Sequence, residues 1–226
     1  MPYLRDTVFV LKKEPYREHD RRYTMYGREH GLLVAVARGS SLRKSKQAGH
    51  LEPLSISDVM IAKGAAFDSL AVARSHRVSW MPSVTSRLAH YAVAGAFAGL
   101  TAELLRPGMI DERIFDLLHE VCSTTGSLPT EPSRERSRLL FSAATLKLLD
   151  ALGYAPDIDA AREGTSPVPS LSLVSFMRRS ALSDVLRVTA STAVLDAASA
   201  FVEEALSQAP LREEPAVLRS VVGIMG

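Results

Sequence analysis

The stretch Arg21–Ala37, which reads RRYTMYGREHGLLVAVA, determines the predicted fold. Polar and apolar side chains alternate from Arg22 to Tyr26, which is the period of a half-buried β-strand. A polar turn leads to Gly31, and the dense apolar run Leu32–Ala37 is short enough for a buried strand. The pattern therefore predicts two strands separated by a turn.

Three more segments have strand character, and they lie on both sides of this pair: Thr7–Lys12, Leu54–Ala62 and Leu70–Val78. Five short strands separated by turn residues indicate a small barrel, because closure removes exposed strand edges. Periodicity alone fits a five-stranded oligonucleotide-binding (OB) barrel and an SH3-like barrel equally well.

After Trp80 the apolar period becomes helical. One helix is expected over Val84–Arg106, where Pro107 and Gly108 terminate it, and a second after an N-cap at Asp111. Pro132 is expected in the first turn of a third helix that ends at Gly153. A loop over 155–170 and helices over 171–190, 192–208 and 211–222 complete the pattern. The prediction is a mixed α+β chain, with an OB-type barrel over 1–80 and an α-helical domain over 81–226.

The composition is that of a folded protein, with 226 residues of which 46% are hydrophobic and 23% charged. The single cysteine, Cys122, excludes an internal disulfide and a thiolate metal cluster, which fits a reducing cytosol. The N-terminus is too polar for a signal peptide, and the apolar run 92–105 is too short to span a bilayer. We expect a cytoplasmic protein.

Charge is distributed unevenly along the chain. Residues 1–80 hold 14 Lys and Arg against 8 Asp and Glu, whereas residues 81–226 hold 13 against 17. This asymmetry suggests that the N-terminal part meets a polyanion. Chance segregation of charge is the alternative.

Four cations, Arg38, Arg43, Lys44 and Lys46, fall within nine residues that contain no acid. A loop of this kind suits contact with phosphates, which supply affinity without reading base sequence. A solvated loop that merely maintains solubility is the alternative.

A second basic group lies before this loop. Arg17, Arg21 and Arg22 stand beside tyrosines, and basic residues with exposed aromatics can track a single strand. Glu18 and Asp20 offset part of the charge, and tyrosines at alternating strand positions are more typical of packing. Arg21 and Arg22 are therefore secondary candidates for DNA contact.

No catalytic or metal site is expected. His19, His30, His50 and His76 match no ligand spacing. Cys122 and His119 lie at helical spacing, yet no third orienting group accompanies them, which favours a buried structural cysteine. Phosphate-binding loops, dinucleotide fingerprints and nucleophile elbows are absent from the sequence.

Short motifs of the first part of the chain occur in a specific order: Glu18-His-Asp20, Tyr23-Thr24, Arg28-Glu-His-Gly31, Val36-Ala-Arg-Gly39, Lys44-Ser-Lys46 and Gly49-His-Leu-Glu-Pro53. This combination resembles the RecO family of DNA repair proteins, and Leu148–Asp157 is similar to a segment of that family's helical domain. The resemblance implies an OB barrel followed by helices, binding of single- and double-stranded DNA, strand annealing, and a place in the bacterial RecFOR pathway at the nucleoid. It also implies RecR and single-stranded-DNA-binding protein as partners.

Two departures from the family pattern matter. Many members carry a four-cysteine zinc module after the segment that corresponds to Leu148–Asp157, but residues 158–164 contain no cysteine, so neither zinc nor another cofactor is expected. The two central arginines of the family's basic loop are replaced by Ser41 and Leu42, with Arg43 as a possible substitute. Individual DNA contacts therefore stay open.

Three functional hypotheses follow. The first is a non-enzymatic recombination mediator, monomeric on its own, that loads recombinase onto DNA coated with single-stranded-DNA-binding protein. The second is an OB-fold protein–protein adaptor with only incidental DNA contact. The third is a small hydrolase that uses Cys122 and His119. Arginines 134, 136 and 138 could additionally line a basic rim for a partner's acidic tail.

Overall fold

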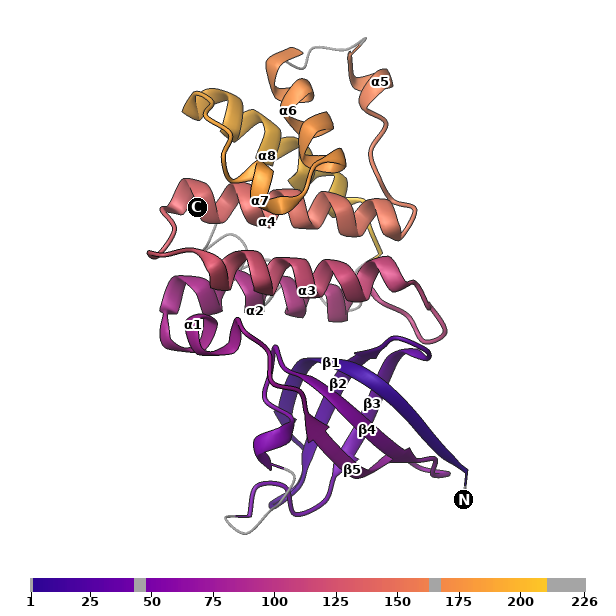
Figure 1. Ribbon diagram of the computed structural model, residues 1–226. Coiled ribbons are helices and arrows are strands. Elements are labelled where there is room, and N and C mark those ends of the chain that lie inside the picture. Colours follow the sequence, from indigo (N-terminus) through magenta and orange to yellow (C-terminus); the bar gives the residue numbers. More distant parts are fainter. Residues whose placement is uncertain (1, 43–47, 163–167, 211–226) are drawn as a thin grey trace.

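The computed structural model describes residues 2–42, 48–162 and 168–210. Five strands form a closed barrel in the order β1-β2-β3-β5-β4 (Figure 1). Their bounds are β1 Tyr3–Pro15, β2 Arg21–Gly27, β3 Gly31–Ala37, β4 Ile56–Ala62 and β5 Ser69–Ser75. All pairs are antiparallel except β3 with β5, which join in parallel at Val36 and Ser69. The barrel is of the OB type, as expected, and the SH3-like alternative is set aside.

β1 pairs with β4 over Tyr3–Phe9 and with β2 over Val8–Pro15, so one long strand joins two neighbours and closes the barrel. Its pairing with β2 shifts register between Val10 and Lys12. Alternate side chains of the strands fill the interior, among them Val8, Tyr23 and Met25, which are fully buried. The period-2 pattern of the sequence thus follows the inner and outer faces of the barrel.

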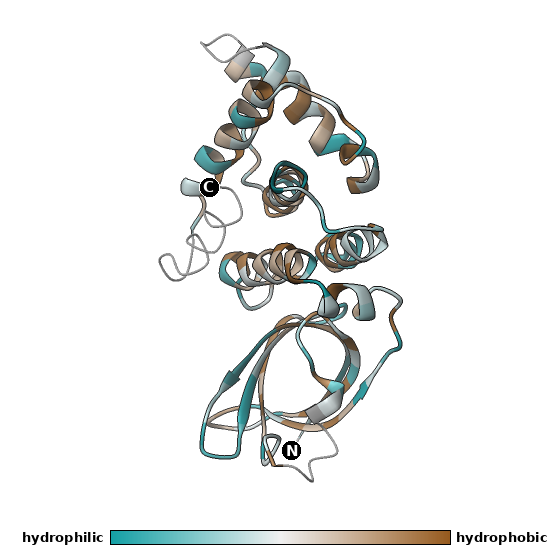
Figure 2. Ribbon diagram, turned by 90° about the vertical axis from the view of Figure 1, so that its left-hand side faces the viewer, coloured by the Kyte–Doolittle hydropathy of each residue, from teal (hydrophilic) through white to brown (hydrophobic). Residues whose placement is uncertain are grey.

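Eight helices of the described residues follow the strands, and a short 3₁₀ turn, Ala48–His50, precedes β4. The helices are α1 Met81–Ser86, α2 Leu88–Leu104, α3 Glu112–Ser127, α4 Arg134–Ala151, α5 Ile158–Arg162, α6 Val168–Arg179, α7 Leu182–Val185 and α8 Thr192–Ser207. Figure 1 shows α1–α3 next to the barrel, α4 beyond them, and α6 and α8 farthest away. In Figure 2 the barrel is seen as a ring below this stack. No helix within the described ranges is long and apolar enough to cross a membrane.

Apolar packing continues from the barrel into the helices. Phe9, Leu11, Tyr26 and Leu32 belong to the same buried cluster as the helical core. The rings of Phe9 and Phe115 meet edge to face with centroids 6.5 Å apart. Secondary structure changes near residue 80, but the core does not stop there, so a division into domains at this point stays a prediction.

Several predicted helix boundaries were confirmed and others were wrong. The Asp111 side chain accepts a hydrogen bond from the backbone N–H of Arg113, so Asp111 is the N-cap of α3 as expected. The single helix expected over Val84–Arg106 is two helices, because Arg87 adopts an extended conformation and its guanidinium donates to the carbonyl of Leu128 (2.8 Å).

Further corrections concern the remaining segments. Ser133 is the N-cap of α4, so Pro132 lies before the helix and not in its first turn. The loop expected over 155–170 contains α5, whose first N–H groups are capped by Asp157. The helix expected over 171–190 is divided into α6 and α7, and the strand expected to reach Val78 ends at Ser75. Residues 211–222 lie outside the described residues.

Candidate nucleic-acid interface

The predicted DNA-contacting residues have different environments. Arg38 is exposed directly after β3, whereas Arg43, Lys44 and Lys46 lie outside the described residues. Arg21 is half-buried and donates to the carbonyl of Asp20 (3.3 Å). Arg22 is exposed, but its guanidinium forms an ion pair with the carboxylate of Glu14 (3.1 Å). Of the candidates that the structure describes, Arg38 is thus the most available cation.

Arg38 belongs to a group of four residues that three different loops bring together: Tyr16, Arg17, Arg38 and Phe67. We call this group the aromatic–arginine cluster. The guanidinium of Arg17 lies 5.3 Å from the ring centre of Tyr16 and 5.7 Å from that of Phe67. The guanidinium of Arg38 lies 5.5 Å from the same Phe67 ring. Two cations therefore flank two aromatic rings at one place on the barrel.

The β1–β2 loop is fastened to the segment that follows β3. The Asp20 carboxylate accepts a hydrogen bond from the N–H of Gly39 (2.8 Å), and the carbonyl of His19 accepts one from Ser41 (3.1 Å). Asp20 thus has a structural role that fixes Arg38 beside Arg17. Its carboxylate, which offsets part of the nearby positive charge, thus accepts a hydrogen bond from the backbone.

The β4–β5 turn holds Phe67 in place. The carboxylate of Asp68 pairs with Lys63 (2.7 Å) and accepts the N–H of Gly64 (3.3 Å), while the Asp68 carbonyl accepts the N–H of Val36 (2.9 Å). A Cβ on Gly64 would lie 2.2 Å from the carbonyl oxygen of Phe67, so this turn requires glycine. Sequence reasoning missed Phe67, because a lone aromatic in a turn carries no local signal.

The outer surface of β2 and β3, a common ligand face of OB barrels, is partly covered by the chain's own helices. The Tyr26 hydroxyl hydrogen-bonds the backbone of Asp111, and Lys12 of β1 forms an ion pair with Glu103 of α2. Tyr23 and Tyr26 are fully buried, which confirms that these tyrosines pack instead of stacking on a ligand. Burial raises the pKa of Tyr26, since its phenolate would lose hydration.

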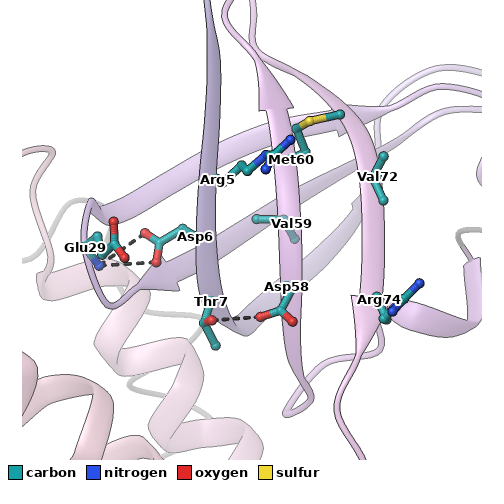
Figure 3. A pocket seen from close by; sticks show the side chains of 9 residues that line it. All are labelled: Arg5, Asp6, Thr7, Glu29, Asp58, Val59, Met60, Val72 and Arg74. Carbon is teal, nitrogen blue, oxygen red and sulfur yellow. Dashed lines mark hydrogen bonds between the residues drawn. The ribbon is translucent and has the colours of Figure 1, made fainter.

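A shallow groove of about 580 Å³ lies on the outer face of β1, β4 and β5 (Figure 3). Figure 3 shows Arg5, Met60 and Val72 across its three strands. The Asp58 carboxylate beside them accepts a hydrogen bond from Thr7 (2.8 Å) and pairs with His76 (2.9 Å). The hydrogen bonds from His76 and Thr7 lower the pKa of Asp58. The predicted site residues do not line this groove.

Cys122 and His119 do not form a catalytic pair. Cys122 is 1% exposed, and burial raises the pKa of its thiol far above the usual range. His119 packs its ring edge to face against Trp80, with centroids 4.6 Å apart. The prediction of a buried structural cysteine is confirmed.

Groups of three or more His, Cys, Asp or Glu side chains that could hold a metal ion do not occur within the described part of the chain. Residues 158–162, which directly follow the segment Leu148–Asp157, form α5. Arg138 at the start of α4 is engaged with Asp196 and Glu203 of α8, while Arg134 and Arg136 are exposed. A basic rim for a partner's acidic tail would therefore consist of Arg134 and Arg136.

Comparison with known proteins agrees with this geometry. The family described as Recombination protein O N terminal matches residues 1–78, which contain all five strands. The chain is 31% identical over 169 residues to "DNA repair protein RecO" of Rubrobacter xylanophilus, covering 75% of this chain and 65% of that protein. It is 31% identical over 163 residues to the protein of the same name from Synechococcus sp. (strain JA-3-3Ab), covering 69% of this chain and 53% of that protein.

A third relative of the same name, from Anaeromyxobacter dehalogenans, is 29% identical over 162 residues and is covered over 61% of its length. The chain thus spans between about half and two thirds of the length of these relatives. The family match over the barrel and the three relatives of the same name agree on one conclusion: residues 1–78 match the N-terminal family of RecO, and the chain is similar to DNA repair proteins of that name over about 70% of its own length.

Proposed function

We propose that the chain acts in DNA repair as a recombination mediator that binds single- and double-stranded DNA without reading its sequence. It promotes annealing of complementary strands and loading of recombinase onto DNA coated with single-stranded-DNA-binding protein. RecR and single-stranded-DNA-binding protein are the proposed partners. The names of its relatives and the OB barrel support this role.

One observation carries the proposal, namely the convergence of Arg17 and Arg38 in the aromatic–arginine cluster. Both side chains are exposed, and within the described residues neither forms an ion pair with a carboxylate. Two cations of the adjoining strands have carboxylate partners: Arg22 of β2 pairs with Glu14, and Lys12 of β1 pairs with Glu103. Uncompensated cations are the groups that gain most from a phosphate, since each contact releases counterions. Arg43, Lys44 and Lys46 begin five positions after Arg38 in the sequence, and we include them in the same proposed DNA-binding site.

The test is a fluorescence titration of labelled oligonucleotides at several salt concentrations. We expect Arg17→Gln and Arg38→Gln to weaken binding to all sequences alike and to reduce the salt slope by about 0.7–1 for each lost phosphate contact. Arg187→Gln, which removes an exposed arginine next to α7 that pairs with Asp184, is the matched control. Unchanged affinity and slope in both cluster variants would place the DNA site elsewhere.

Annealing is tested with complementary strands coated with single-stranded-DNA-binding protein. The triple variant Arg43→Ala, Lys44→Ala, Lys46→Ala should anneal more slowly than the unaltered chain. If it anneals at the same rate with the fold intact, the loop has no part in this activity.

The groove of Figure 3 supports the adaptor as a second candidate function. Its exposed Val72 and half-buried Met60 lie between Arg5 and Arg74, a mixture of apolar and charged groups that suits a protein partner. The adaptor predicts that Val72→Asp abolishes capture of RecR or single-stranded-DNA-binding protein in a pull-down while DNA binding is weak at physiological salt. Strong DNA binding by the purified chain would contradict it.

A further inference from the structure

The two aromatic rings of the aromatic–arginine cluster belong to neither apolar core. Tyr16 and Phe67 are absent from both buried clusters of the described residues, and Tyr16 is 38% exposed. Two loops that are fifty-one residues apart nevertheless bring these rings to a centroid distance of 6.1 Å. Packing within the barrel does not account for this pair, so a ligand for its ring faces is the natural explanation.

The rings meet at an angle of 59°, so they form an open V instead of a closed stack. Aromatic side chains that stand open at a surface offer π-faces on which a planar base can stack. Arg17 and Arg38 lie over these rings without a carboxylate partner among the described residues, and guanidinium groups held this way at an exposed site are bound only weakly. They can turn towards a phosphate, or remain and offer their own planes for stacking.

Three anchored loops hold the rings and cations in register before any ligand arrives. Asp20 fastens the β1–β2 loop to Gly39, and Asp68 fastens the β4–β5 turn to Val36 and Lys63. A site whose groups are positioned in advance loses less entropy when it binds.

We propose that Tyr16 and Phe67 form a stacking platform for unpaired bases, bracketed by Arg17 and Arg38, which makes this part of the barrel selective for single-stranded over duplex DNA. The inference rests on the proposed DNA-binding function and adds the chemical group that is recognised. In a duplex the bases are stacked on one another and their faces are not available, whereas phosphates are present in both forms. The platform therefore contributes to single-strand affinity alone, and the arginines contribute to both.

The experiment compares three probes of equal length: an oligothymidine, an abasic strand with the same phosphates but no bases, and a duplex. The variants are Tyr16→Leu, Phe67→Leu and their combination, which keep apolar bulk and remove the π-face. We expect the combination to weaken oligothymidine binding about 5- to 150-fold, the range for one lost base stack, and to leave the salt slope unchanged. Binding of the abasic strand and of the duplex should not change.

Controls separate stacking from structural support. Tyr91→Leu removes an aromatic of α2 that is 42% exposed and should affect no probe. Phe67→Tyr, which restores a ring, should recover most of the oligothymidine affinity. Thermal unfolding of every variant checks that the loops retain their fold.

The outcomes distinguish the platform from the function. Equal losses for all three probes, or no loss for oligothymidine while Arg38→Gln weakens every probe, would overturn the platform and leave the proposed function standing. An unaltered chain that binds none of the probes at physiological salt would overturn both.

Discussion

Tyr26 and Asp111 exchange two hydrogen bonds where the barrel meets the helices. The Tyr26 hydroxyl accepts the backbone N–H of Asp111 (2.9 Å) and donates to the Asp111 carbonyl (3.1 Å). Asp111 is also the N-cap of α3, so a single phenol on β2 fixes the point from which that helix begins. The Tyr26 phenol therefore helps to fix the orientation of α3 against the barrel, together with the contact between Phe9 and Phe115.

Tyr26→Phe should destabilise the chain by about 1–3 kcal/mol, because it leaves the partly buried N–H of Asp111 without its hydrogen-bond acceptor. The measurement is chemical denaturation followed by circular dichroism, with Tyr91→Phe at the protein surface as the control. Equal stability of the two variants would mean that water replaces the hydroxyl.

Alkaline pH should destabilise the chain through the same phenol. Burial raises the pKa of Tyr26 in the folded state, so folding holds a proton that the unfolded chain releases near pH ~10. The stability from this group is fully present below that pH and is lost as pH rises through the folded pKa. As pH rises above ~10, the denaturation midpoint should thus fall less steeply for Tyr26→Phe than for the unaltered chain. Parallel curves would contradict this prediction.

Two glycines in helices should respond in opposite directions to alanine. A Cβ on Gly126 of α3 would lie 2.6 Å from the Cβ and 2.9 Å from the Cα of Trp80, so Gly126→Ala should cost about 1–3 kcal/mol despite its better helix propensity. A Cβ on Gly95 of α2 would meet only the Tyr91 ring at 3.8 Å, so Gly95→Ala should be neutral or add up to about 1 kcal/mol. Thermal unfolding of both variants is the measurement, and stabilisation by Gly126→Ala would refute the close packing of α3 on Trp80.

The ion pair of Lys12 and Glu103 should contribute more to the stability of the fold than the ion pair of Arg22 and Glu14. The Glu103 side chain is only 11% exposed, so Lys12→Met leaves a buried carboxylate without a partner and should cost about 3 kcal/mol. Arg22→Gln breaks an exposed pair and should cost about 1 kcal/mol or less. The double variant Lys12→Met, Glu103→Leu should recover much of the loss in denaturation experiments. If it does not, packing around Lys12 and not its charge is responsible.

Cys122 should be inert in the folded chain. Its thiol is buried with a raised pKa, so a thiol reagent at neutral pH should react only as fast as the chain unfolds. Cys122→Ser should retain full activity in annealing, whereas the hydrolase hypothesis requires complete loss of a hydrolytic function. Rapid labelling under native conditions would contradict the burial.

The strands were predictable because a barrel imposes alternation on the sequence, as Arg22–Tyr26 shows. The break between α1 and α2 was not predictable. Arg87 has an extended backbone there, and its guanidinium donates to the carbonyl of Leu128, which lies forty-one residues later in the sequence. Asp157 is a residue type that favours helix N-caps, so α5 could have been predicted from it. The prolines and the glycine nearby led to the prediction of a loop instead.

The candidate site was predictable only in part. Arg38 could be predicted as a DNA-contacting residue because the basic segment that it begins contains no acid. The pairing of Arg22 with Glu14 could not be predicted, because it depends on the register of β1 and β2. Phe67 could not be found from local pattern, because its partners Tyr16 and Arg38 come from loops that only barrel closure brings together.

The apolar seam between barrel and helices has a consequence for biosynthesis. During synthesis the strands emerge first, and Phe9, Leu11, Tyr26 and Leu32 have no cover until α2 and α3 have followed them. Exposed apolar surface on a partly made chain promotes aggregation. A nascent barrel should therefore be a substrate for chaperones until Phe115 closes over Phe9, and a barrel cut from its helices should be poorly soluble.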